Sequence, residues 1–377
     1  MATTVDHVVV GGGVIGSAAA WQLAARGRDV VLLERFGPGH TNGASHGSSR
    51  IYRNSYASDD YLGLAHEALG LWRALEDESA SSLLTFTGAV SHGLGRADLD
   101  AIAGAFTARG LPHAWLDADE AEARWPGLRF EGRVLHETRT AGRLHADRSV
   151  AALQAAAAAR GADVRHGCPV RAIRDHVDFA VVDTDAGLVR ARTVVVAAGA
   201  WTTRLVGDAL GPGALPPLVV TQEQPAHFAV RPGFGGGWPA FTHQPAAPHP
   251  WPSGVYGLAA PGEGVKVGFH AVGPVTDPDR RTFRPEPGQL ARLQDYVRHW
   301  LPGADADDVR PISCTYTCTP DHDFVLDRVG RLVVAAGFSG HGFKFAPAIG
   351  RLLADLATDD DARTLSRFRL GRAHAAA

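Results

Sequence analysis

A glycine-rich turn near the start of the chain limits the possible folds more than any other feature. The apolar run Val8–Val10 predicts a buried strand, and the pattern Gly11-x-Gly13-x-x-Gly16 follows it at once. The segment Ser17–Arg26 is rich in alanine and predicts a helix. A strand that turns through closely spaced glycines into a helix is typical of Rossmann-type α/β folds, where the helix N-terminus faces a phosphate group.

The residues after this helix complete a βαβ unit. Gly27 is suited to end the helix, because glycine adopts the left-handed conformation without strain. The apolar run Val30–Leu33 predicts a second strand, and Glu34 follows it directly. In such units an acidic residue about 20 positions beyond the last glycine binds the ribose of a dinucleotide. We therefore expect a dinucleotide-binding domain; the alternative is a tight glycine turn in an unrelated α/β protein.

Later segments resemble the first strand and indicate that this domain recurs along the chain. Thr193–Trp201 and Leu332–Phe338 are apolar strands that end in small residues. Helical periodicity marks Tyr61–Leu75, a segment from Asp147 as N-cap to Ala159, and a final helix over Ile349–Leu356.

The blocks between these segments have a different character. Residues 211–262 are rich in Pro, Gly and Trp and include the strand-like run Pro225–Val230, and Leu290–Trp300 predicts a helix that ends at Pro302. The sequence thus predicts an α/β fold with a Rossmann-type domain and a second α+β domain that carries a mixed or antiparallel sheet. The expected boundaries are 1–84, 146–215 and 311–377 for the nucleotide domain, and 85–145 and 216–310 for the substrate domain.

Length and composition narrow the classes of function. A chain of 377 residues is long enough for two domains. A net charge of −3 argues against nucleic acid or an anionic membrane as a partner. No apolar run approaches the roughly 20 residues that span a bilayer, and no secretory signal is evident. Three cysteines make no disulfide framework, so a cytoplasmic protein is expected. The expected assembly is a monomer or a weak dimer.

Lysine is almost absent, which makes its two positions informative. All but two of the 37 basic residues are arginine, and the exceptions are Lys266 and Lys344. Both stand among glycine, aromatic and histidine neighbours, unlike lysines on a solvated face. An ammonium is a compact point charge whose pKa moves on burial, so arginine does not replace it equally. The alternative is that these two lysines are leftovers of an arginine-biased composition.

Three further clusters contain groups capable of chemistry. The first runs from Gly43 to Arg53 and contains His46, Arg50 and Arg53; on a helical turn the two arginines would point to similar space. The second is Cys314–Asp321, whose CxxxC spacing fits neither a redox CxxC nor a zinc site, so no metal is expected. The third is the loop Gly337–Lys344, whose backbone N–H groups could face an anion. A solvated basic loop, two buried thiols and a plain connecting loop are the respective alternatives.

Together these clusters resemble those of the sarcosine oxidase and N-methyltryptophan oxidase family, within the D-amino-acid-oxidase-like flavoproteins. The resemblance spans nearly the whole chain. It is carried by Ser45-His46-Gly47-x-x-Arg50-x-x-Arg53, by Cys314-x-Tyr316-Thr317, and by Phe338-Ser-Gly-His-Gly-Phe-Lys344. It implies an FAD amine oxidase that converts an N-methyl amino acid to an imine while oxygen becomes hydrogen peroxide.

The resemblance also implies roles for individual residues. Cys314 matches the cysteine that bonds covalently to the flavin, and Cys318 stays a free thiol. Lys266 matches the lysine beside the flavin where oxygen is reduced. The residues implied to hold FAD are Gly11, Gly13, Val14, Ile15, Gly16, Glu34, Arg35, Ser45, Ser49, Arg50, Val170, Ala198, Gly199, Trp201, Cys314, Gly340, Gly342 and Lys344.

The substrate side is implied in the same way. Arg53 and Lys344 match the pair that binds the substrate carboxylate, and Tyr256 and His270 match residues that line the substrate. His46 and Arg50 match residues close to the flavin ring and, with Lys266, Tyr256 and His270, are the expected catalytic groups.

Some positions depart from the family pattern and leave the substrate open. Ser48-Ser49 stands where Asp-Thr is frequent, Tyr52 replaces an aliphatic residue, and residues 235–253 match poorly. An oxidase of cyclic imino acids of the pipecolate or proline type is therefore an alternative. A flavin-binding protein without oxidase activity and an NAD-dependent dehydrogenase are alternatives of other classes.

Overall fold

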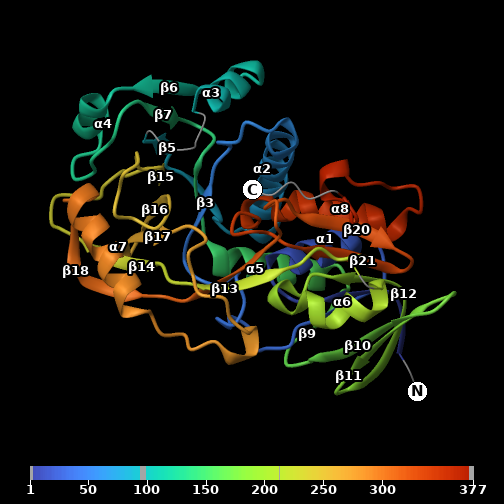
Figure 1. Cartoon of the computed structure of the whole chain (residues 1–377). Helices are drawn as coiled ribbons and strands as arrows, with labels where there is room; N and C mark the ends of the chain where they lie inside the picture. Colours follow the sequence, from blue (N-terminus) through green and yellow to red (C-terminus); the bar gives the residue numbers. More distant parts are fainter. Residues whose placement is uncertain (1–2, 94–98, 212, 373–377) are drawn as a thin grey trace.

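The structure, a computed structural model, describes residues 3–93, 99–211 and 213–372 (Figure 1). Most strands belong to one of two eight-stranded sheets, and two small sheets complete the fold. Figure 1 places the first large sheet with α1, α6 and α8 on the right and the second with α7 on the left. The mixed α/β class predicted from the sequence is confirmed.

The first large sheet is built from the start, middle and end of the chain, as predicted. Its centre is parallel, in the order β9-β2-β1-β12-β21; β20 and the β10-β11 hairpin pair antiparallel to it. Burial on both faces explains why these strands read as continuous Val and Leu runs. The strands are β1 (Thr3–Val10), β2 (Val30–Leu33), β9 (Asp163–Arg165), β10 (Val170–Asp175), β11 (Ala180–Thr184), β12 (Gly187–Val196), β20 (Val325–Val329) and β21 (Leu332–Ala336).

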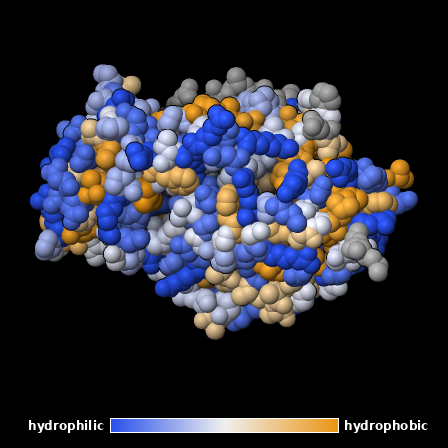
Figure 2. All heavy atoms as spheres, turned by 90° about the horizontal axis from the view of Figure 1, so that it is seen from below, coloured by the Kyte–Doolittle hydropathy of each residue, from blue (hydrophilic) through white to orange (hydrophobic). Residues whose placement is uncertain are grey.

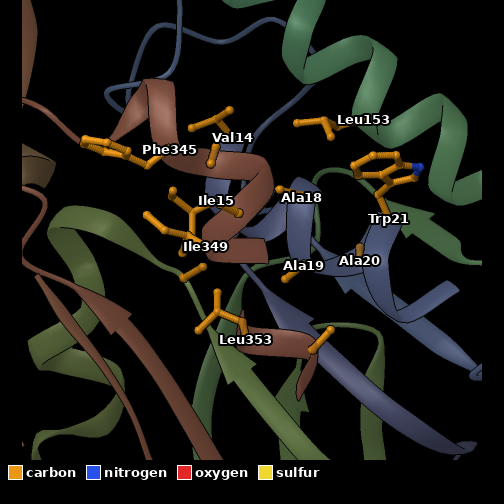
Figure 3. Close-up of a cluster of buried hydrophobic side chains, with 14 of the residues drawn as sticks. Val14, Ile15, Ala18, Ala19, Ala20, Trp21, Leu153, Phe345, Ile349 and Leu353 are labelled. Atoms are coloured by element: carbon orange, nitrogen blue, oxygen red, sulfur yellow. The ribbon is translucent and has the colours of Figure 1, made fainter. Parts of the chain in front are cut away.

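A layer of helices packs against this sheet. Small residues let α1 and α8 approach closely: a Cβ on Gly350 would lie 2.5 Å from the Ala18 carbonyl carbon. Figure 3 shows Val14, Ala18 and Trp21 of α1 facing residues of α8 and α5 in the resulting core. The helices are α1 (Val14–Ala25), α2 (Asp59–Ser79), α5 (Ala146–Ala159), α6 (Thr202–Leu210) and α8 (Ala346–Thr358), with short 3-10 turns η1 (Gly199–Trp201), η3 (Phe343–Phe345) and η4 (Ser366–Phe368).

Helix positions agree with the sequence better than helix ends do. The α1 helix ends at Ala25, and Gly27 follows with φ +68°, which confirms its predicted role. The prediction that Asp147 caps α5 is wrong, because the N-cap is His145, whose ring accepts the Arg148 N–H. Asp147 instead accepts a hydrogen bond from Gly47 N at 2.7 Å, in a loop 100 residues earlier.

The second large sheet is mixed, as expected. Its strand order is β18-β14-β17-β16-β15-β5-β7-β6; only the β15-β5 pair is parallel. Helices α3 (Leu99–Ala108), α4 (Ala118–Arg124) and α7 (Pro287–Trp300) accompany it. Its strands are β5 (Ala89–His92), β6 (His113–Leu116), β7 (Val134–Glu137), β14 (Ala226–Val230), β15 (Ala240–His243), β16 (Val255–Ala260), β17 (Gly264–Phe269) and β18 (Ala304–Pro311).

Two small sheets complete the fold. One has the order β3-β8-β4 and the other pairs β13 with β19. The expected domain boundaries at 84/85 and 145/146 fall in and just after this three-stranded sheet, and the boundaries stay a prediction. The strands are β3 (Arg50–Tyr52), β4 (Leu84–Phe86), β8 (Gly142–Leu144), β13 (Val219–Glu223) and β19 (Cys314–Cys318).

The face of the molecule shown in Figure 2 is largely polar. Figure 2 shows hydrophilic residues over most of one face, with hydrophobic residues in small scattered patches. Among the helices described, none combines the length and apolar character that crossing a bilayer requires.

Candidate active site

The glycine turn after β1 forms one end of a large cavity. Gly11 has φ +104°, and a Cβ there would lie 2.4 Å from the Ala197 carbonyl oxygen, so any side chain would be excluded. A Cβ on Gly16 would lie 1.9 Å from the Gly11 oxygen, so only glycine at this position lets the helix pack so close to the turn. Val14 N donates to Ser45 Oγ at 3.0 Å, so the turn is joined to the next loop.

Glu34 ends β2 beside this turn with its carboxylate held in place. Gly12 N donates to Oε2 at 2.7 Å and Phe36 N to Oε1 at 2.9 Å, while His40 Nε2 lies 3.4 Å from Oε1. Burial alone would raise the pKa of Glu34, but the hydrogen bonds from His40, Phe36 and Gly12 outweigh it and lower that pKa. The carboxylate is therefore ionised and can accept hydrogen bonds from the hydroxyl groups of a ribose.

The loop before β3 presents polar atoms that lack partners. His46 Nε2 and Ser49 Oγ are buried without a hydrogen bond to any residue that the structure describes. Burial lowers the pKa of His46 to about 3, with help from Arg50 and Lys266, so the ring is neutral. Unsatisfied buried polar atoms of this kind indicate a ligand or water that the protein is shaped to bind.

The two arginines of this segment are arranged differently from the prediction. Arg50–Tyr52 is strand β3, not a helical turn, so the helical spacing expected to bring Arg50 and Arg53 together is wrong. Arg50 reaches back and donates to the Ala44 and Ser49 carbonyls, each at 2.8 Å. Arg53 lies beyond the strand and donates to the Ser55 carbonyl. Both nevertheless reach the wall of the cavity.

Strand β19 places one of its two cysteines in the cavity. Cys314 is half-buried and lines the wall, with Sγ 4.0 Å from the Ala44 carbonyl oxygen. Cys318 lies outside the set of lining residues, and burial, with Glu223, raises its pKa to about 11. The two thiols of the CxxxC segment therefore differ in access, and neither is disulfide-bonded.

Lys266 on β17 brings a buried ammonium to the cavity. The residue is 6% exposed, and no hydrogen bond joins its Nζ to any residue of the described chain. Burial, followed by repulsion from Arg50, lowers the pKa of Lys266 to about 7. An ammonium without a partner in a cavity wall is costly unless a ligand or water meets it.

Lys344 follows the β21 loop and is held firmly. Its Nζ donates to Tyr56 OH and to the His341 carbonyl, both at 2.8 Å. Burial and Arg53 lower the pKa of Lys344 well below its ordinary value. The loop before it passes close to an aromatic ring, because a Cβ on Gly340 would lie 2.3 Å from Tyr316 Cε2.

Tyr256 and His270 lie on the same side of the cavity as Lys266. Tyr256 is on β16, where burial raises its pKa above the ordinary range. His270 follows β17 and its ring centroid lies 5.4 Å from that of Tyr316. Although solvent reaches His270, the protein around the ring desolvates it, and with Arg53 this lowers its pKa to about 4.

One cavity of about 1100 Å³ collects all of these groups. Gly16 is the one predicted site residue that does not line it, because this glycine packs against Gly11 behind the turn. No cluster of side chains suited to a metal ion occurs among the described residues. The predicted residues that do line the cavity are Gly11, Gly13, Val14, Ile15, Glu34, Arg35, Ser45, His46, Ser49, Arg50, Arg53, Val170, Ala198, Gly199, Trp201, Tyr256, Lys266, His270, Cys314, Gly340, Gly342 and Lys344.

The cavity fits an FAD molecule on three observations. The backbone of its glycine turn, Gly11–Gly13, lines the cavity at the N-terminus of α1, where such folds bind a pyrophosphate. The ionised Glu34 stands at the end of β2, where a ribose binds. The buried polar atoms of His46 and Ser49 lie farther along, where they need a partner.

Sequence reasoning missed an ionic clasp at the nucleotide end. Asp279, in the short 3-10 turn η2 (Pro278–Arg280), accepts hydrogen bonds from Arg35 at 2.7 Å and from Trp201 Nε1 at 2.9 Å. Arg204 also donates to Asp279 and lies 2.7 Å from Asp277. The Asp-Pro-Asp turn was the only local signal, and it does not reveal partners more than 70 residues away.

Comparisons with known proteins agree with this site. A family model for FAD-dependent oxidoreductases (DAO) matches residues 6–356. The chain is 32% identical to monomeric sarcosine oxidase of Bacillus sp. strain NS-129, over 99% of this chain and 98% of that protein. It is 29% identical to N-methyl-L-tryptophan oxidase of Yersinia pestis, over 97% and 99% of the two chains.

A solved structure supports the same assignment. The open form of NikD, described as an unusual amino acid oxidase essential for nikkomycin biosynthesis, superposes with a TM-score of 0.85 and 31% identity. The alignment covers 99% of each chain. On these grounds the chain belongs to the DAO family of FAD-dependent oxidoreductases, with the sarcosine oxidases among its relatives.

Proposed function

We propose that this protein is an FAD-dependent oxidase of secondary amino acids, with N-methyl amino acids as the main substrates. The carrying observation is the pair of buried lysines in one cavity, one with hydrogen-bond partners and one without. An enzyme that binds a carboxylate and reduces oxygen needs a cation for each task. The names of the relatives support the same class of substrate.

The residues that line the nucleotide half of the cavity would hold the cofactor. The pyrophosphate would lie at the Gly11–Gly13 turn and the N-terminus of α1, and the ribose at Glu34. FAD, when bound, accepts the two electrons removed from the substrate and passes them to molecular oxygen, which becomes hydrogen peroxide. The other proposed FAD contacts are Val14, Ile15, Arg35, Ser45, Ser49, Arg50, Val170, Ala198, Gly199, Trp201, Gly340, Gly342 and Lys344.

Arg53 and Lys344 would bind the substrate carboxylate. The guanidinium of Arg53 can form two parallel hydrogen bonds, and Lys344 supplies a second positive charge. Burial first, and repulsion from Arg53 second, lower the pKa of Lys344, and an anion between the two side chains would offset both effects. Binding the carboxylate orients the C–N bond of the substrate in the cavity.

Tyr256 and His270 would line the substrate nitrogen. With a pKa of about 4 the His270 ring is neutral at physiological pH, so it can accept a hydrogen bond from the amine. An uncharged substrate nitrogen releases electrons more readily than an ammonium. The neutral His270 ring does not repel a proton that leaves the substrate nitrogen. For an N-methyl substrate, the imine product hydrolyses to formaldehyde and the primary amino acid.

Lys266 would assist the reduction of oxygen. Its ammonium faces the cavity without a protein partner and stabilises negative charge that develops on oxygen. Arg50 lies beside it and adds positive potential, while the neutral ring of His46 helps to exclude water.

Cys314 would carry the cofactor covalently through a thioether to the flavin ring. This proposal rests on the access of its sulfur to the cavity and on the match of the segment to the family motif. Three free thiols fit a reducing compartment, so we also infer a cytoplasmic location. A monomer or weak dimer stays a separate prediction.

An anaerobic reduction screen tests the proposed function. The FAD-loaded protein is mixed with sarcosine, other N-methyl amino acids, and cyclic secondary amino acids, and the loss of flavin absorbance is followed before oxygen is admitted and peroxide measured. Bleaching by the N-methyl compounds followed by peroxide formation supports the proposal. Bleaching by cyclic compounds alone selects the cyclic imino acid oxidase instead, and no bleaching by any secondary amino acid refutes both.

A further inference from the structure

The second sheet extends the cavity past the proposed reaction centre. The register places Gly268 opposite Tyr256, Tyr256 opposite Thr242, and Thr242 opposite Ser91, in a row across β17, β16, β15 and β5. Directly opposed residues point to the same face of a sheet. Tyr256, Thr242 and Ser91 all line the cavity, so the row runs along its wall.

The alternate residues of β5 and β15 belong to the opposite face. His243 and His92 stack there with ring centroids 4.1 Å apart, and His243 Nδ1 lies 2.9 Å from Tyr296 OH in an apolar cluster. His243 belongs to a core on that face, although His92 also reaches the wall of the cavity. The other face offers the Thr242–Ser91 row to the cavity.

The polar side chains of this row have hydrogen-bonding groups that the protein does not use. Thr242 Oγ1 and Ser91 Oγ lie 2.9 Å apart and share one hydrogen bond, so one of their two hydroxyl hydrogens remains free to donate. Gln244, which directly follows the end of β15 and also lines the wall, has a carboxamide without a hydrogen bond to any residue the structure describes. Gly254 makes room for it, because a Cβ there would lie 2.5 Å from Gln244 Nε2.

The two strands that carry Ser91 and Thr242 favour a neutral group, and the nearest lysine of this sheet, Lys266, lies on β17. Neither β5 nor β15 contains a charged residue, so a charged ligand group would lack an ion-pair partner on these strands. Leu258 and Ile102 add apolar surface to the same wall. Adjacent strands lie about 4.8 Å apart, so Thr242 is one strand spacing and Ser91 about 10 Å from Tyr256.

We propose that Thr242, Ser91 and Gln244 form a subsite for the substrate's side chain, which ends in a neutral polar group such as a carboxamide. This inference rests on the proposed function and narrows it: the preferred substrate is a secondary amino acid with an extended, neutral polar side chain. Sarcosine, which has no side chain, leaves the subsite filled only by water. A longer substrate displaces this water and makes its own hydrogen bonds to the subsite, which favours its binding over that of sarcosine.

Three substrates of nearly equal length test the proposal. N-methyl-L-glutamine, N-methyl-L-norleucine and N-methyl-L-glutamate differ only in the end group, and sarcosine lacks it. The second-order rate constant for anaerobic flavin reduction by N-methyl-L-glutamine should be about tenfold or more above that for each of the other three. A tenfold difference corresponds to one net hydrogen bond. Dissociation constants of non-oxidisable 2-methoxy acid analogues, measured from perturbation of the flavin spectrum, should show the same order without any turnover.

Variants identify the subsite residues. Thr242→Val and Gln244→Leu should each reduce the glutamine-to-norleucine ratio about tenfold, whereas Thr242→Ser keeps a hydroxyl and should retain the ratio. Thr87→Val is the control, because Thr87 donates to its neighbouring Gly88 carbonyl and lies outside the cavity wall.

The outcomes separate the two proposals. If sarcosine reduces the flavin but N-methyl-L-glutamine is no better, or the ratio survives Thr242→Val and Gln244→Leu, the subsite is wrong and the proposed function stands. If none of the secondary amino acids reduces the flavin, the proposed function itself fails.

Discussion

Lys266 and Lys344 lie in the wall of one cavity, yet only Lys344 has its ammonium held by the protein. Lys344 Nζ donates to Tyr56 OH and the His341 carbonyl, while Lys266 Nζ meets no described residue within hydrogen-bonding distance. A held cation is suited to fix one end of a substrate. A free one is suited to a small ligand that arrives and leaves within each turnover.

This contrast predicts that the two lysines affect different half-reactions. Lys266→Met should slow reoxidation of the reduced enzyme by oxygen about 100-fold, because the charge that stabilises the transition state is lost. Anaerobic reduction by substrate should change much less. Stopped-flow absorbance resolves both rates, and equal slowing of the two would contradict the assignment.

Lys344→Met is the matched comparison. It should weaken anaerobic reduction through poorer binding of the substrate carboxylate and leave the reaction with oxygen closer to the normal rate. The reverse pattern would exchange the roles of the two lysines.

Lys266 also sets an expected pH dependence. Its pKa is lowered from 10.5 to about 7, so the ammonium is present below pH 7 and is lost as pH rises through that value. The rate of reoxidation should therefore fall above about pH 7, and Lys266→Met should remove this step. Arg50, Cys314, Glu263 and Asp147 are the other charged or titratable groups that act on Lys266.

His46 and His270 do not account for the same step. Their pKa values of about 3 and about 4 keep both rings neutral near pH 7. A reoxidation rate that rises through pH 7, or a step that survives in Lys266→Met, would show that another group titrates.

The two cysteines of β19 allow a direct test of the covalent linkage. Flavin should remain with the polypeptide after acid precipitation, and Cys314→Ser should release it to the supernatant. Cys318→Ser should keep it bound, because Cys318 lies outside the cavity wall and its pKa is raised to about 11. Yellow supernatant from the unmodified protein would rule out the linkage.

Local patterns predicted the parts of the fold that local interactions decide. The βαβ unit, the strand β21 and the final helix follow from apolar periodicity, which depends on neighbours a few residues away. The loop from β21 to Lys344 was located for the same reason. These segments bring most predicted residues to the cavity.

What the sequence did not show depends on pairing between distant segments. Arg50–Tyr52 becomes a strand because Gly142–Leu144 pairs with it, about 90 residues away, so the helical turn expected for Arg50 and Arg53 was wrong. Asp147 binds Gly47 instead of capping its helix, and the Asp279 clasp joins residues far apart in sequence. Propensity carries no information on such contacts.

The packing role of Gly16 can be tested by stability. Gly16→Ala would place a Cβ 1.9 Å from the Gly11 carbonyl oxygen, so backbone must move. We expect a loss of about 3 kcal/mol or more of unfolding free energy, together with weaker FAD binding. Denaturant unfolding of the FAD-loaded enzyme measures the first.

Gly70→Ala provides the control in another helix. Gly70 lies exposed in α2, and no described atom outside its own helix turn lies within 4 Å of where a Cβ would stand. Alanine there should stabilise the protein by about 0.5–1 kcal/mol, because it restricts the unfolded chain more than glycine does. A Gly16→Ala variant as stable as the parent protein would contradict the packing described at the turn.

Arg53 should determine preference for a carboxylate. Its guanidinium reaches the cavity beside Lys344, whose pKa is lowered by burial and then by Arg53. Arg53→Ala should raise the substrate KM about 10- to 100-fold, the usual effect of losing a charge-assisted hydrogen bond, and reduce discrimination between an N-methyl amino acid and its methyl ester. Arg53→Lys should recover part of the affinity, because charge returns without the two-pronged geometry. Steady-state kinetics with the acid and ester pair measure both effects, and an unchanged acid-to-ester ratio in Arg53→Ala would place the carboxylate elsewhere.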